Sequence, residues 1–257
     1  MFSFNPPKGF LSKKTILITG ASDGIGKYCA LNFANHGANL ILLGRSTEKL
    51  EKIYDMTHDF NPDGITIHPL DFTSATISDY EQISKSIEEQ YDRLDGLVHS
   101  AGMLGARCPI EHYPVEAWEQ TFQVNTSAVF LLTKFLLPSL RRSDDARILF
   151  TSSSVGREGR GNWGAYAVSK FAVEGLMQVL AKELEKTSSI KVNSLNPGGI
   201  QTNMRKAAYP AENPISVPSP EILMPLYLYL FSPESQGIHG EALNFKGFDP
   251  LSYAKKG

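Results

Sequence analysis

The sequence has few cysteines and no cluster of metal-ligand residues. Cys29 and Cys108 are the two cysteines in 257 residues, and neither has a second cysteine or a histidine at the spacing of a zinc site. We therefore expect no disulfide framework and no metal centre. So few cysteines are typical of a protein from a reducing compartment, and we expect a cytoplasmic location.

An excess of charge and a long apolar run are also lacking. The formal net charge is −2, from 25 basic and 27 acidic residues, and no basic stripe suited to nucleic acid phosphates is present. No apolar run approaches the roughly 18 residues that cross a bilayer. The start of the chain lacks the charged-then-apolar order of a signal peptide. We expect neither nucleic acid nor a membrane as a partner.

The chain does contain a regular alternation of short β-branched runs and helical patterns. The first run, residues 15–19, stops at Gly20 and is typical of a strand buried on both faces, and helical spacing follows from Ile25 to His36. The same spacing predicts further strands and helices. The strands are predicted at 39–43, 65–70, 94–99, 147–151, 190–195 and 242–245, and the helices at 47–60, 77–91, 115–140, 165–186 and 221–231.

This order predicts an α/β fold: a single doubly wound Rossmann-type domain over residues 1–257, with a mostly parallel sheet of about seven strands and helices on both faces. The rhythm breaks at residues 203–220, which carry four prolines. Because this segment follows the carboxyl end of a strand, we predict a substrate loop.

A glycine-rich turn joins the first strand to the first helix. Gly20, Gly24 and Gly26 lie where a missing Cβ lets backbone N–H groups approach a pyrophosphate at the positive end of a helix dipole. The spacing Gly-x-x-x-Gly-x-Gly differs from the commoner Rossmann fingerprint. A tight turn without a ligand is the alternative, but the flanking strand and helix favour a dinucleotide site.

The end of the second predicted strand indicates which dinucleotide binds. Arg45 follows Gly44 about 25 residues after Gly20, where an NAD enzyme normally carries an acid that grips the ribose 2′-hydroxyl. A guanidinium suits a 2′-phosphate instead, so we predict NADP(H) as the cofactor. The alternative is that Arg45 merely opens the next helix in solvent.

Tyr166 and Lys170 lie one helical turn apart, downstream of Ser153. A hydride delivered to a carbonyl carbon leaves an alkoxide that needs a proton, and Tyr166 is the candidate acid. A cation at i+4 favours the phenolate and so lowers the pKa of the phenol from about 10. Ser153 is predicted to hydrogen-bond the substrate oxygen. Taken singly, the tyrosine as a core aromatic and the serine as a turn hydroxyl are the alternatives.

In order and spacing, these segments resemble the short-chain dehydrogenase/reductase family over nearly the whole chain. The matching positions are Thr19 with the glycine turn, Asp71, His99-Ser100-Ala101-Gly102, Asn125, Ser153 with Tyr166 and Lys170, and the run Asn196-Pro197-Gly198-Gly199-Ile200-Gln201-Thr202. The resemblance implies an oxidoreductase that acts on a carbonyl or secondary alcohol. Its nearest family analogy is a 3-oxoacyl thioester or related ketone.

The resemblance also implies roles for single residues. Asn125 would be the fourth catalytic residue, holding a water that connects Lys170 to solvent, and Lys170 would also reach the nicotinamide ribose. Asp71 would meet the adenine. The whole cofactor-binding set is predicted as Gly20, Ser22, Asp23, Gly24, Ile25, Gly26, Arg45, Asp71, Phe72, Ser100, Ala101, Gly102, Asn125, Tyr166, Lys170, Pro197, Gly198, Gly199, Ile200 and Thr202.

The chain departs from the family pattern in places that keep alternatives open. His99-Ser100 replaces the usual Asn-Asn, and Leu243-Asn244-Phe245-Lys246 stands near the place of the usual Val-Asp-Gly-Gly. Asp23 lies where many NADP-preferring relatives carry a basic residue, so an NAD-linked dehydrogenase is an alternative. A dinucleotide-sensing binding protein without turnover is another, although it would not need Tyr166.

Two further expectations concern apolar side chains. The helix predicted at 115–140 is apolar around much of its circumference, so we expect a homodimer or homotetramer; burial within one chain is the alternative. Apolar residues near the site could line a substrate pocket or simply pack. They are Met103, Leu104, Trp163, Met204 and Tyr209.

Overall fold

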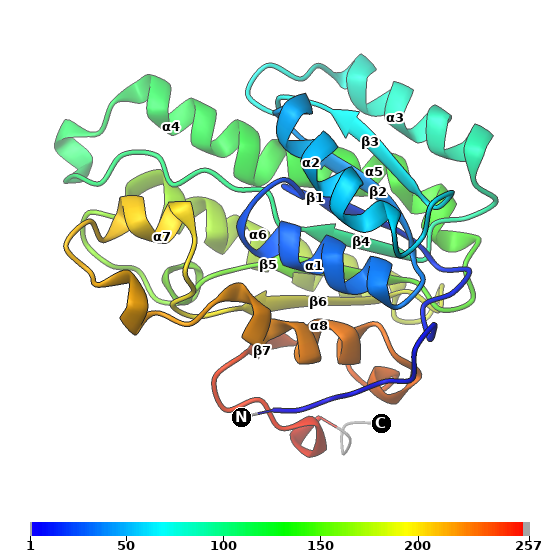
Figure 1. Ribbon diagram of the computed structural model, residues 1–257. Helices are drawn as coiled ribbons and strands as arrows, with labels where there is room; N and C mark the ends of the chain where they lie inside the picture. The colour runs from blue at the N-terminus through cyan, green and yellow to red at the C-terminus, as the bar shows by residue number, and fades with distance from the viewer. Residues whose placement is uncertain (1, 254–257) are drawn as a thin grey trace.

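The computed structural model describes residues 2–253, which form a single α/β domain around one seven-stranded sheet (Figure 1). The strand order is β3-β2-β1-β4-β5-β6-β7, and every strand pairing in this range is parallel. The expected doubly wound fold is confirmed. The predicted domain bounds also include residues 1 and 254–257, which lie outside the described residues. The strands are β1 (Thr15–Thr19), β2 (Asn39–Gly44), β3 (Ile65–Pro69), β4 (Gly96–His99), β5 (Arg147–Thr151), β6 (Lys191–Asn196) and β7 (Ala242–Asn244).

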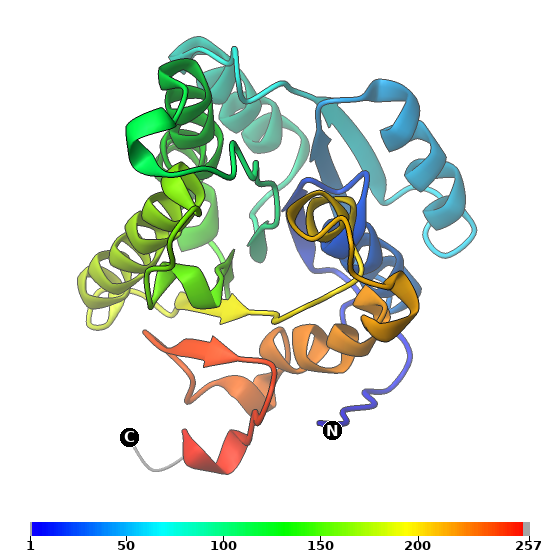
Figure 2. The ribbon, with the colours of Figure 1, turned by 90° about the vertical axis from the view of Figure 1, so that its left-hand side faces the viewer.

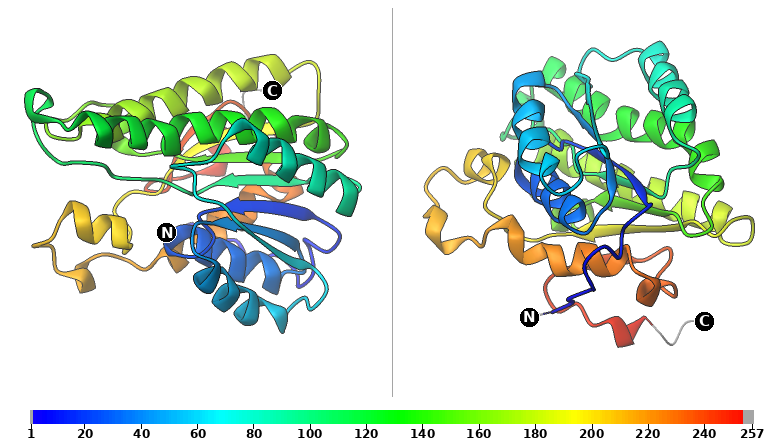
Figure 3. Two further views of the ribbon diagram at one scale, coloured as in Figure 1. Left: turned by 90° about the horizontal axis from the view of Figure 1, so that it is seen from above. Right: turned by 45° about the vertical axis from the view of Figure 1, so that its right-hand side comes forward.

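Helices connect successive strands and cover both faces of the sheet. Figure 3 shows α1 and α2 on one side of the sheet and α3, α5 and α6 on the other. These elements are α1 (Gly24–Asn35), α2 (Thr47–His58), α3 (Ile77–Gln90), α4 (Val115–Phe122), α5 (Ala128–Arg141), α6 (Gly164–Leu184), α7 (Asn203–Ala208) and α8 (Met224–Leu230).

Each central strand contributes to two hydrophobic cores. Ile16 and Ile18 pack with Phe33 of α1 in one core, whereas Leu17 between them packs with Leu136 of α5 in the other. Successive strand side chains point to opposite faces, so a strand covered on both sides must be apolar throughout. This is why the strands read as continuous β-branched and leucine runs.

The strand order places a crevice at the carboxyl ends of β1 and β4. The chain proceeds outward from β1 to β3 and then returns to β4 on the other side of β1. Ligands of open α/β sheets bind where the strand order reverses in this way. Figure 2 looks onto the end of the molecule at which α7 lies in front of the sheet.

The structure differs from the sequence prediction in two segments. The helix expected at 115–140 consists of α4, a π-helical turn η2 (Gln123–Ser127) and α5. The loop expected at 203–220 begins with α7, because Thr202 caps that helix by accepting a hydrogen bond from the Arg205 backbone N–H at 3.1 Å. The helix predicted at 221–231 is confirmed for α8 and begins with a 3-10 turn, Pro220–Leu223.

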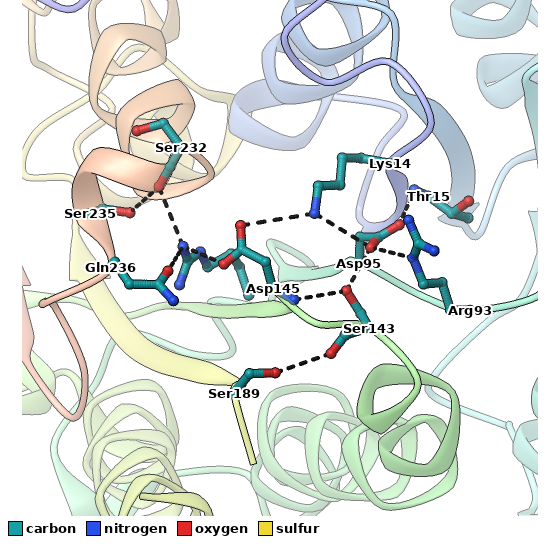
Figure 4. Close-up of polar contacts among 11 residues, drawn as sticks. Lys14, Thr15, Arg93, Asp95, Ser143, Asp145, Ser189, Ser232, Ser235 and Gln236 are labelled. Atoms are coloured by element: carbon teal, nitrogen blue, oxygen red, sulfur yellow. Dashed lines mark hydrogen bonds and ion pairs between the residues drawn. The ribbon is translucent and has the colours of Figure 1, made fainter.

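A buried carboxylate joins the amino ends of the strands, opposite the crevice (Figure 4). Asp95, just before β4, accepts hydrogen bonds from the Thr15 backbone N–H at 2.9 Å, from Ser143 Oγ at 2.6 Å and from Arg93 Nε at 2.9 Å. Burial raises the pKa of Asp95, but these three hydrogen bonds outweigh it, so the pKa is lowered overall. The carboxylate stays ionised and ties β1, β4 and the segment before β5 together.

Arg147 extends these contacts to the segment after α8. Its guanidinium is 4% exposed, lies 2.6 Å from Asp145 and donates to Gln236 Oε1 at 2.7 Å. Burial lowers the pKa of Arg147. The amino ends of the sheet are therefore held by buried charge, which leaves the opposite end free for a binding site.

Three observations bear on the expectations drawn from composition. No helix within residues 2–253 has both the length and the apolar character that a membrane span requires. In that same range, no three His, Cys, Asp or Glu side chains are grouped as metal ligands would be. Both cysteines are free, and burial raises the pKa of the Cys29 thiol.

Candidate active site

A cleft of about 550 Å³ opens at the carboxyl ends of the strands. Its walls come from the turn after β1, the loops after β2 to β6, the first part of α6, and α7. Of the residues predicted to bind a cofactor, all but Gly26, Asn125 and Gly199 line this cleft. Ser153 lines it as well. The structure thus brings together residues that lie far apart in the sequence, such as Ser22 and Thr202, which are 180 positions apart.

The glycine turn packs directly on the loop after β4. Gly20 has a φ of +64°, and a Cβ there would lie 2.8 Å from Ala101 Cα, so only glycine fits. Thr19 Oγ1 accepts hydrogen bonds from the Ser100 and Ala101 backbone N–H groups, each at 3.0 Å. A Cβ at Gly26 would collide with the Gly20 carbonyl oxygen, so Gly26 serves the close packing of α1 on the turn.

Asp23 closes the amino end of α1 and reaches across to α7. Its Oδ1 accepts a hydrogen bond from the Gly24 N–H at 2.7 Å, and its Oδ2 accepts one from Asn203 Nδ2 at 2.6 Å. Both carboxylate oxygens therefore have partners. Asp23 acts as the helix cap and as a tie to α7, which gives a structural reason for an acid at this position.

Two cations stand at the end of β2. Arg45 is exposed and lines the cleft together with Ser46 and Lys49 of the first turn of α2. Lys49 was not among the residues predicted to bind the cofactor. Ser46 could have indicated it, because Ser46 caps a helix that starts at Thr47 and so places Lys49 one turn beyond Arg45. Both charges suit an anionic group near the end of β2.

Asp71, in the loop after β3, is held by contacts within that loop. Its Oδ1 accepts hydrogen bonds from the Thr73 backbone N–H at 2.9 Å and from Thr73 Oγ1 at 2.8 Å. These two bonds lower the pKa of Asp71, and the charge of Arg45 adds a smaller lowering. The carboxylate is therefore ionised and fixed in place at neutral pH.

His99 takes the position of the usual first asparagine and supports β4 in another way. Thr133 Oγ1 donates to the Val129 carbonyl oxygen at 2.7 Å, so it accepts from His99 Nε2–H at 2.9 Å. The imidazole also stacks on Phe150, with ring centroids 5.0 Å apart. Burial, together with the charge of Lys170, lowers the pKa of His99 to about 3, so the ring is neutral.

Tyr166 and Lys170 on α6 face the cleft beside Ser153, which follows β5. Burial raises the pKa of Tyr166, and its hydrogen bond with Ser153 opposes that rise. The net direction is opposite to the one expected from Lys170 alone, because the phenol loses its water. Lys170 Nζ lies 5.7 Å from the centre of the Tyr166 ring and donates to the Thr151 carbonyl oxygen at 2.7 Å.

Lys170 is itself perturbed by its surroundings. Burial lowers the pKa of its ammonium from 10.5 to about 8, and the charge of Glu174 one turn later opposes this lowering. A Cβ at Gly156 would lie 2.6 Å from Lys170 Cβ, so the turn η3 (Ser154–Gly156) packs without a gap on α6. This contact fixes Ser153 relative to Lys170.

Asn125 lies in the π-helical turn η2, behind the wall of the cleft. Its Oδ1 accepts from the Met103 N–H at 2.7 Å, and its Nδ2 donates to the Met103 carbonyl oxygen at 2.9 Å and to Ser169 Oγ at 3.0 Å. The side-chain amide is therefore fully engaged in holding the loop after β4 against α6.

The part of the cleft beyond Tyr166 is apolar. Leu104, Trp163, Met204 and Tyr209 belong to one cluster with Tyr166, and they and Met103 line the cleft, so they do more than pack within the core.

Two arginines hold the outer edge of this apolar part. Arg107 Cζ lies 4.0 Å from the centre of the Trp163 ring, and its Nη1 donates to the Ala208 carbonyl oxygen at 2.9 Å. Arg205 Cζ lies 3.8 Å from the centre of the Tyr209 ring, and its guanidinium forms a bidentate pair with Glu212. Neither arginine was predicted from the sequence. The partners of Arg107 lie on other elements, and Arg205 pairs with Glu212 inside the segment that was predicted to be a loop.

The chain is similar to known oxidoreductases over almost its full length. A family model described as short chain dehydrogenase matches residues 14–213. The uncharacterized oxidoreductase YciK of Escherichia coli strain K12 is 45% identical over 233 residues, which are 91% of this chain and 92% of YciK.

Two solved structures extend this similarity to the fold. A short chain dehydrogenase of Shigella flexneri, complexed with NADP, has a TM-score of 0.90 at 43% identity; 93% of this chain and 99% of that one are covered. One of Escherichia coli, complexed with NADPH, has a TM-score of 0.89 at 44% identity, with the same coverage. Because the matched segment runs from β1 through α7 and includes the glycine turn and Tyr166 with Lys170, the chain belongs to the short-chain dehydrogenase/reductase family.

Proposed function

We propose that this protein is an NADP(H)-dependent oxidoreductase that interconverts a carbonyl group and a secondary alcohol. The observation that carries the proposal is the meeting of Ser153, Tyr166 and Lys170 in the same cleft as the glycine turn. An acid, a hydrogen-bond donor and a cation beside a dinucleotide site are the groups that carbonyl reduction requires.

The residues of the cleft fit a dinucleotide with a 2′-phosphate. Ser22, Gly24 and Ile25 line the cleft, so the positive end of α1 faces it and can receive a pyrophosphate. Arg45 and Lys49 supply positive charge at the end of β2. The NADP and NADPH complexes of the Shigella and Escherichia relatives support the same choice. When bound, NADPH supplies the hydride.

The protein residues handle the proton and the substrate oxygen. Tyr166 remains protonated at neutral pH because burial raises the pKa of its phenol, so it can donate a proton to the carbonyl oxygen. Ser153 donates a hydrogen bond to the same oxygen and so positions it. The Lys170 ammonium stabilises the phenolate that remains.

We further propose a path by which Tyr166 recovers its proton. The side chain of Asn125 is engaged with Met103 and Ser169, which leaves its backbone carbonyl in the π-helical turn as the group to hold a water. Such turns are frequent at functional sites. That water would connect Lys170 to solvent.

The substrate pocket favours a carbonyl compound whose groups next to the carbonyl are apolar. Its lining beyond Tyr166 is Leu104, Trp163, Met204 and Tyr209, and the nearby Arg205 is neutralised by Glu212. A 3-oxoacyl thioester or a related ketone is the nearest family analogy. We also propose a cytoplasmic location, which the two free cysteines support.

A panel of ketones assayed by NADPH absorbance tests this proposal. We expect turnover of apolar ketones, slower turnover when a carboxylate adjoins the carbonyl, and at least tenfold weaker binding of NADH than of NADPH. Tighter binding of NADH would favour an NAD-linked dehydrogenase. Tight NADPH binding with no consumption on any ketone would favour a dinucleotide-sensing binding protein.

A further inference from the structure

Arg157, the first residue after η3, contacts three other elements. Its Nε donates to Glu174 Oε1 of α6 at 2.8 Å. Its Nη2 donates to the Leu243 carbonyl oxygen at 3.0 Å and to Ser194 Oγ of β6 at 3.2 Å, and its Nη1 donates to Asn244 Oδ1 of β7 at 2.9 Å. Every guanidinium nitrogen therefore has an acceptor.

Glu174 is the buried anchor of this arrangement. It is 5% exposed, lies one helical turn after Lys170, and accepts a second hydrogen bond at Oε2 from Ser194 Oγ at 2.7 Å. The ion pair of Arg157 with Glu174 thus fastens the turn that carries Ser153 to the helix that carries Tyr166 and Lys170. It does so beside the gap-free contact of Gly156 with Lys170.

Asn244 carries the same chain of contacts to the loop after β6. Its Oδ1 also accepts from Asn196 Nδ2 at 2.9 Å, and Asn196 Oδ1 accepts from the Gly198 backbone N–H at 3.1 Å. Gly198 lines the cleft. Asn244 lies in the segment where this sequence differs from the family's Val-Asp-Gly-Gly, and it is the side chain of that segment that accepts a hydrogen bond from Arg157.

We propose that Arg157 is a positioning residue that, through Glu174 and Asn244, sets the placement of Ser153, the Tyr166–Lys170 helix face and the loop after β6. The inference rests on the proposed function of this site. Neither Arg157 nor its two partners line the cleft, so the effect passes through the residues that do.

A positioning role explains the Arg157–Glu174 pair better than stabilisation alone. The attraction within a buried ion pair does little more than offset the cost of desolvating its two charges, and apolar residues of similar size often stabilise a fold as well as such a pair does. The planar guanidinium fork, in contrast, fixes several acceptors in one geometry. Glu174 also keeps a negative charge near Lys170, opposing the effect of burial on its pKa.

The first test compares Arg157→Leu with the double variant Arg157→Leu/Glu174→Leu. The single variant should lower kcat about ten- to a hundredfold, because a displacement of about 1 Å can cost that much. The Kd for NADPH should stay within about threefold. The double variant removes the unpaired carboxylate, so its Tm should recover while kcat stays low. Recovery of both Tm and kcat would show that the pair only stabilises the fold and would overturn the proposal.

Arg157→Lys tests the fork itself. It keeps the charge but can serve fewer acceptors at once, so kcat should lie between those of the wild type and Arg157→Leu. Lys182→Met removes the exposed pair of Lys182 with Glu185 on the same helix and is the matched control; its kcat should equal that of the wild type. A kcat for Arg157→Lys equal to that of the wild type would show that charge alone matters and would contradict the role of the fork.

The second test does not depend on turnover. Lysine NMR, with the Lys170 signal assigned by Lys170→Arg, follows the pKa of that ammonium in the wild type and in Glu174→Gln. The charged or titratable groups that act on Lys170 are Glu174, Tyr166 and His99, and Glu174 is the one anion among them. The pKa should fall below its wild-type value of about 8, because the charge of Glu174 no longer opposes the effect of burial. An unchanged value would show that Glu174 does not act on Lys170 and would contradict the proposed route through Glu174, whereas a wild type without activity on any ketone would refute only the proposed function.

Discussion

Burial raises the pKa of the Tyr166 phenol, so at neutral pH the group is an acid with its proton in place. Tyr166→Phe removes this proton and keeps the ring that packs against Trp163 at 5.7 Å. We expect the fold and NADPH affinity to persist while turnover falls at least about a hundredfold, the scale of a lost general acid. Kinetics with NADPH and a ketone check this, and retained reduction in the variant would contradict the assignment.

Lys170 sets the expected pH dependence. Because burial lowers its pKa from 10.5 to about 8, the ammonium is present below pH 8 and is lost as the pH rises through that value. Since the ammonium stabilises the phenolate, kcat/KM for ketone reduction should fall above about pH 8. A profile that stays flat to pH 9.5 would exclude this role for Lys170.

The same pKa predicts a change in stability. Above pH 8 the folded chain has lost the Lys170 proton, while the unfolded chain keeps it up to about 10.5, so the unfolded state binds more protons. The free energy of unfolding should therefore rise by about 3 kcal/mol between these pH values relative to Lys170→Met. Urea titrations of both proteins at pH 8 and 10 provide the measurement.

Arg45 is expected to decide the choice between NADPH and NADH. A charge-assisted hydrogen bond to the 2′-phosphate is worth roughly 1.5 to 3 kcal/mol, so Arg45→Ala should weaken NADPH by about ten- to 150-fold and leave NADH unchanged. Gly44→Asp should go further, because a carboxylate repels the phosphate. A Cβ at Gly44 would lie 3.2 Å from Leu50 Cδ2 and 3.3 Å from Ser22 Oγ, both side-chain rather than backbone atoms.

Calorimetric titration of both cofactors into the wild type and the two variants distinguishes the outcomes. Equal wild-type affinities, or an Arg45→Ala loss that NADH shares, would show that Arg45 is only a solvated helix start. Lys49 offers a comparison, because it lines the same part of the cleft and lies one turn further along α2.

The elements show which parts of the structure the sequence could predict. The strands and most helices follow from local periodicity, because strands buried on both faces and amphipathic helices leave patterns within a few residues of each other. The π-helical turn η2 could not be predicted from this periodicity, since one inserted residue leaves the apolar pattern around Val124 and Ala128 almost unchanged. The cap at Thr202 that starts α7 was hidden by the prolines that follow it.

In the candidate site too, some features could be predicted from the sequence and others could not. The glycine turn and the Tyr166–Lys170 pair carry spacing constraints and could be predicted as a group, although their roles remain predictions. The contacts of Asp23 with Asn203 and of Arg157 with Glu174 could not, because they depend on how distant segments pack. The direction of the pKa of Tyr166 also required the structure, since burial of the phenol outweighs what its neighbours in the sequence imply.

Asp95 is expected to stabilise the whole sheet without affecting the cleft. Its side chain is 1% exposed, and its loss would leave Arg93 and the Thr15 N–H without an acceptor. Asp95→Ala should lower the free energy of unfolding by about 1 to 3 kcal/mol, because the Thr15 N–H is left unsatisfied, whereas Arg93 is 38% exposed and can be hydrated. Because its pKa is lowered in the fold, this stability is present above about pH 4 and is lost as the pH falls below that value.

Urea titrations of the wild type and Asp95→Ala at pH 7 and pH 3 measure this effect. The difference between the two proteins should shrink at the lower pH. The Kd for NADPH should not change, because Asp95 precedes β4 whereas the cleft is lined by residues that follow the strands. A large change in Kd would show instead that the two ends of the sheet are coupled.

Exposed apolar side chains on α5 and α6 bear on the expected assembly of the molecule. On α5, Val129, Leu132 and Leu136 are buried within the chain, so intramolecular packing explains part of the apolar helix. It does not explain Phe130, which is 48% exposed, or Phe171 on α6, which is 44% exposed. Figure 3 shows these two helices side by side on one side of the sheet. A second copy of the same face is the simplest cover for this patch, because most soluble oligomers are symmetric.

We therefore expect a homodimer, or a homotetramer built from such dimers, at micromolar concentration. Light scattering of the wild type gives the mass, and a monomer would refute the expectation. A charge placed in the patch should be desolvated in the assembly, so Phe171→Glu should shift the mass toward the monomer. Ile215→Glu is the matched control, since Ile215 is 91% exposed and lies after α7, away from α5 and α6. If Phe171→Glu stays assembled, the contact between copies does not involve Phe171; if both variants dissociate, the effect of the added charge is not specific to α6.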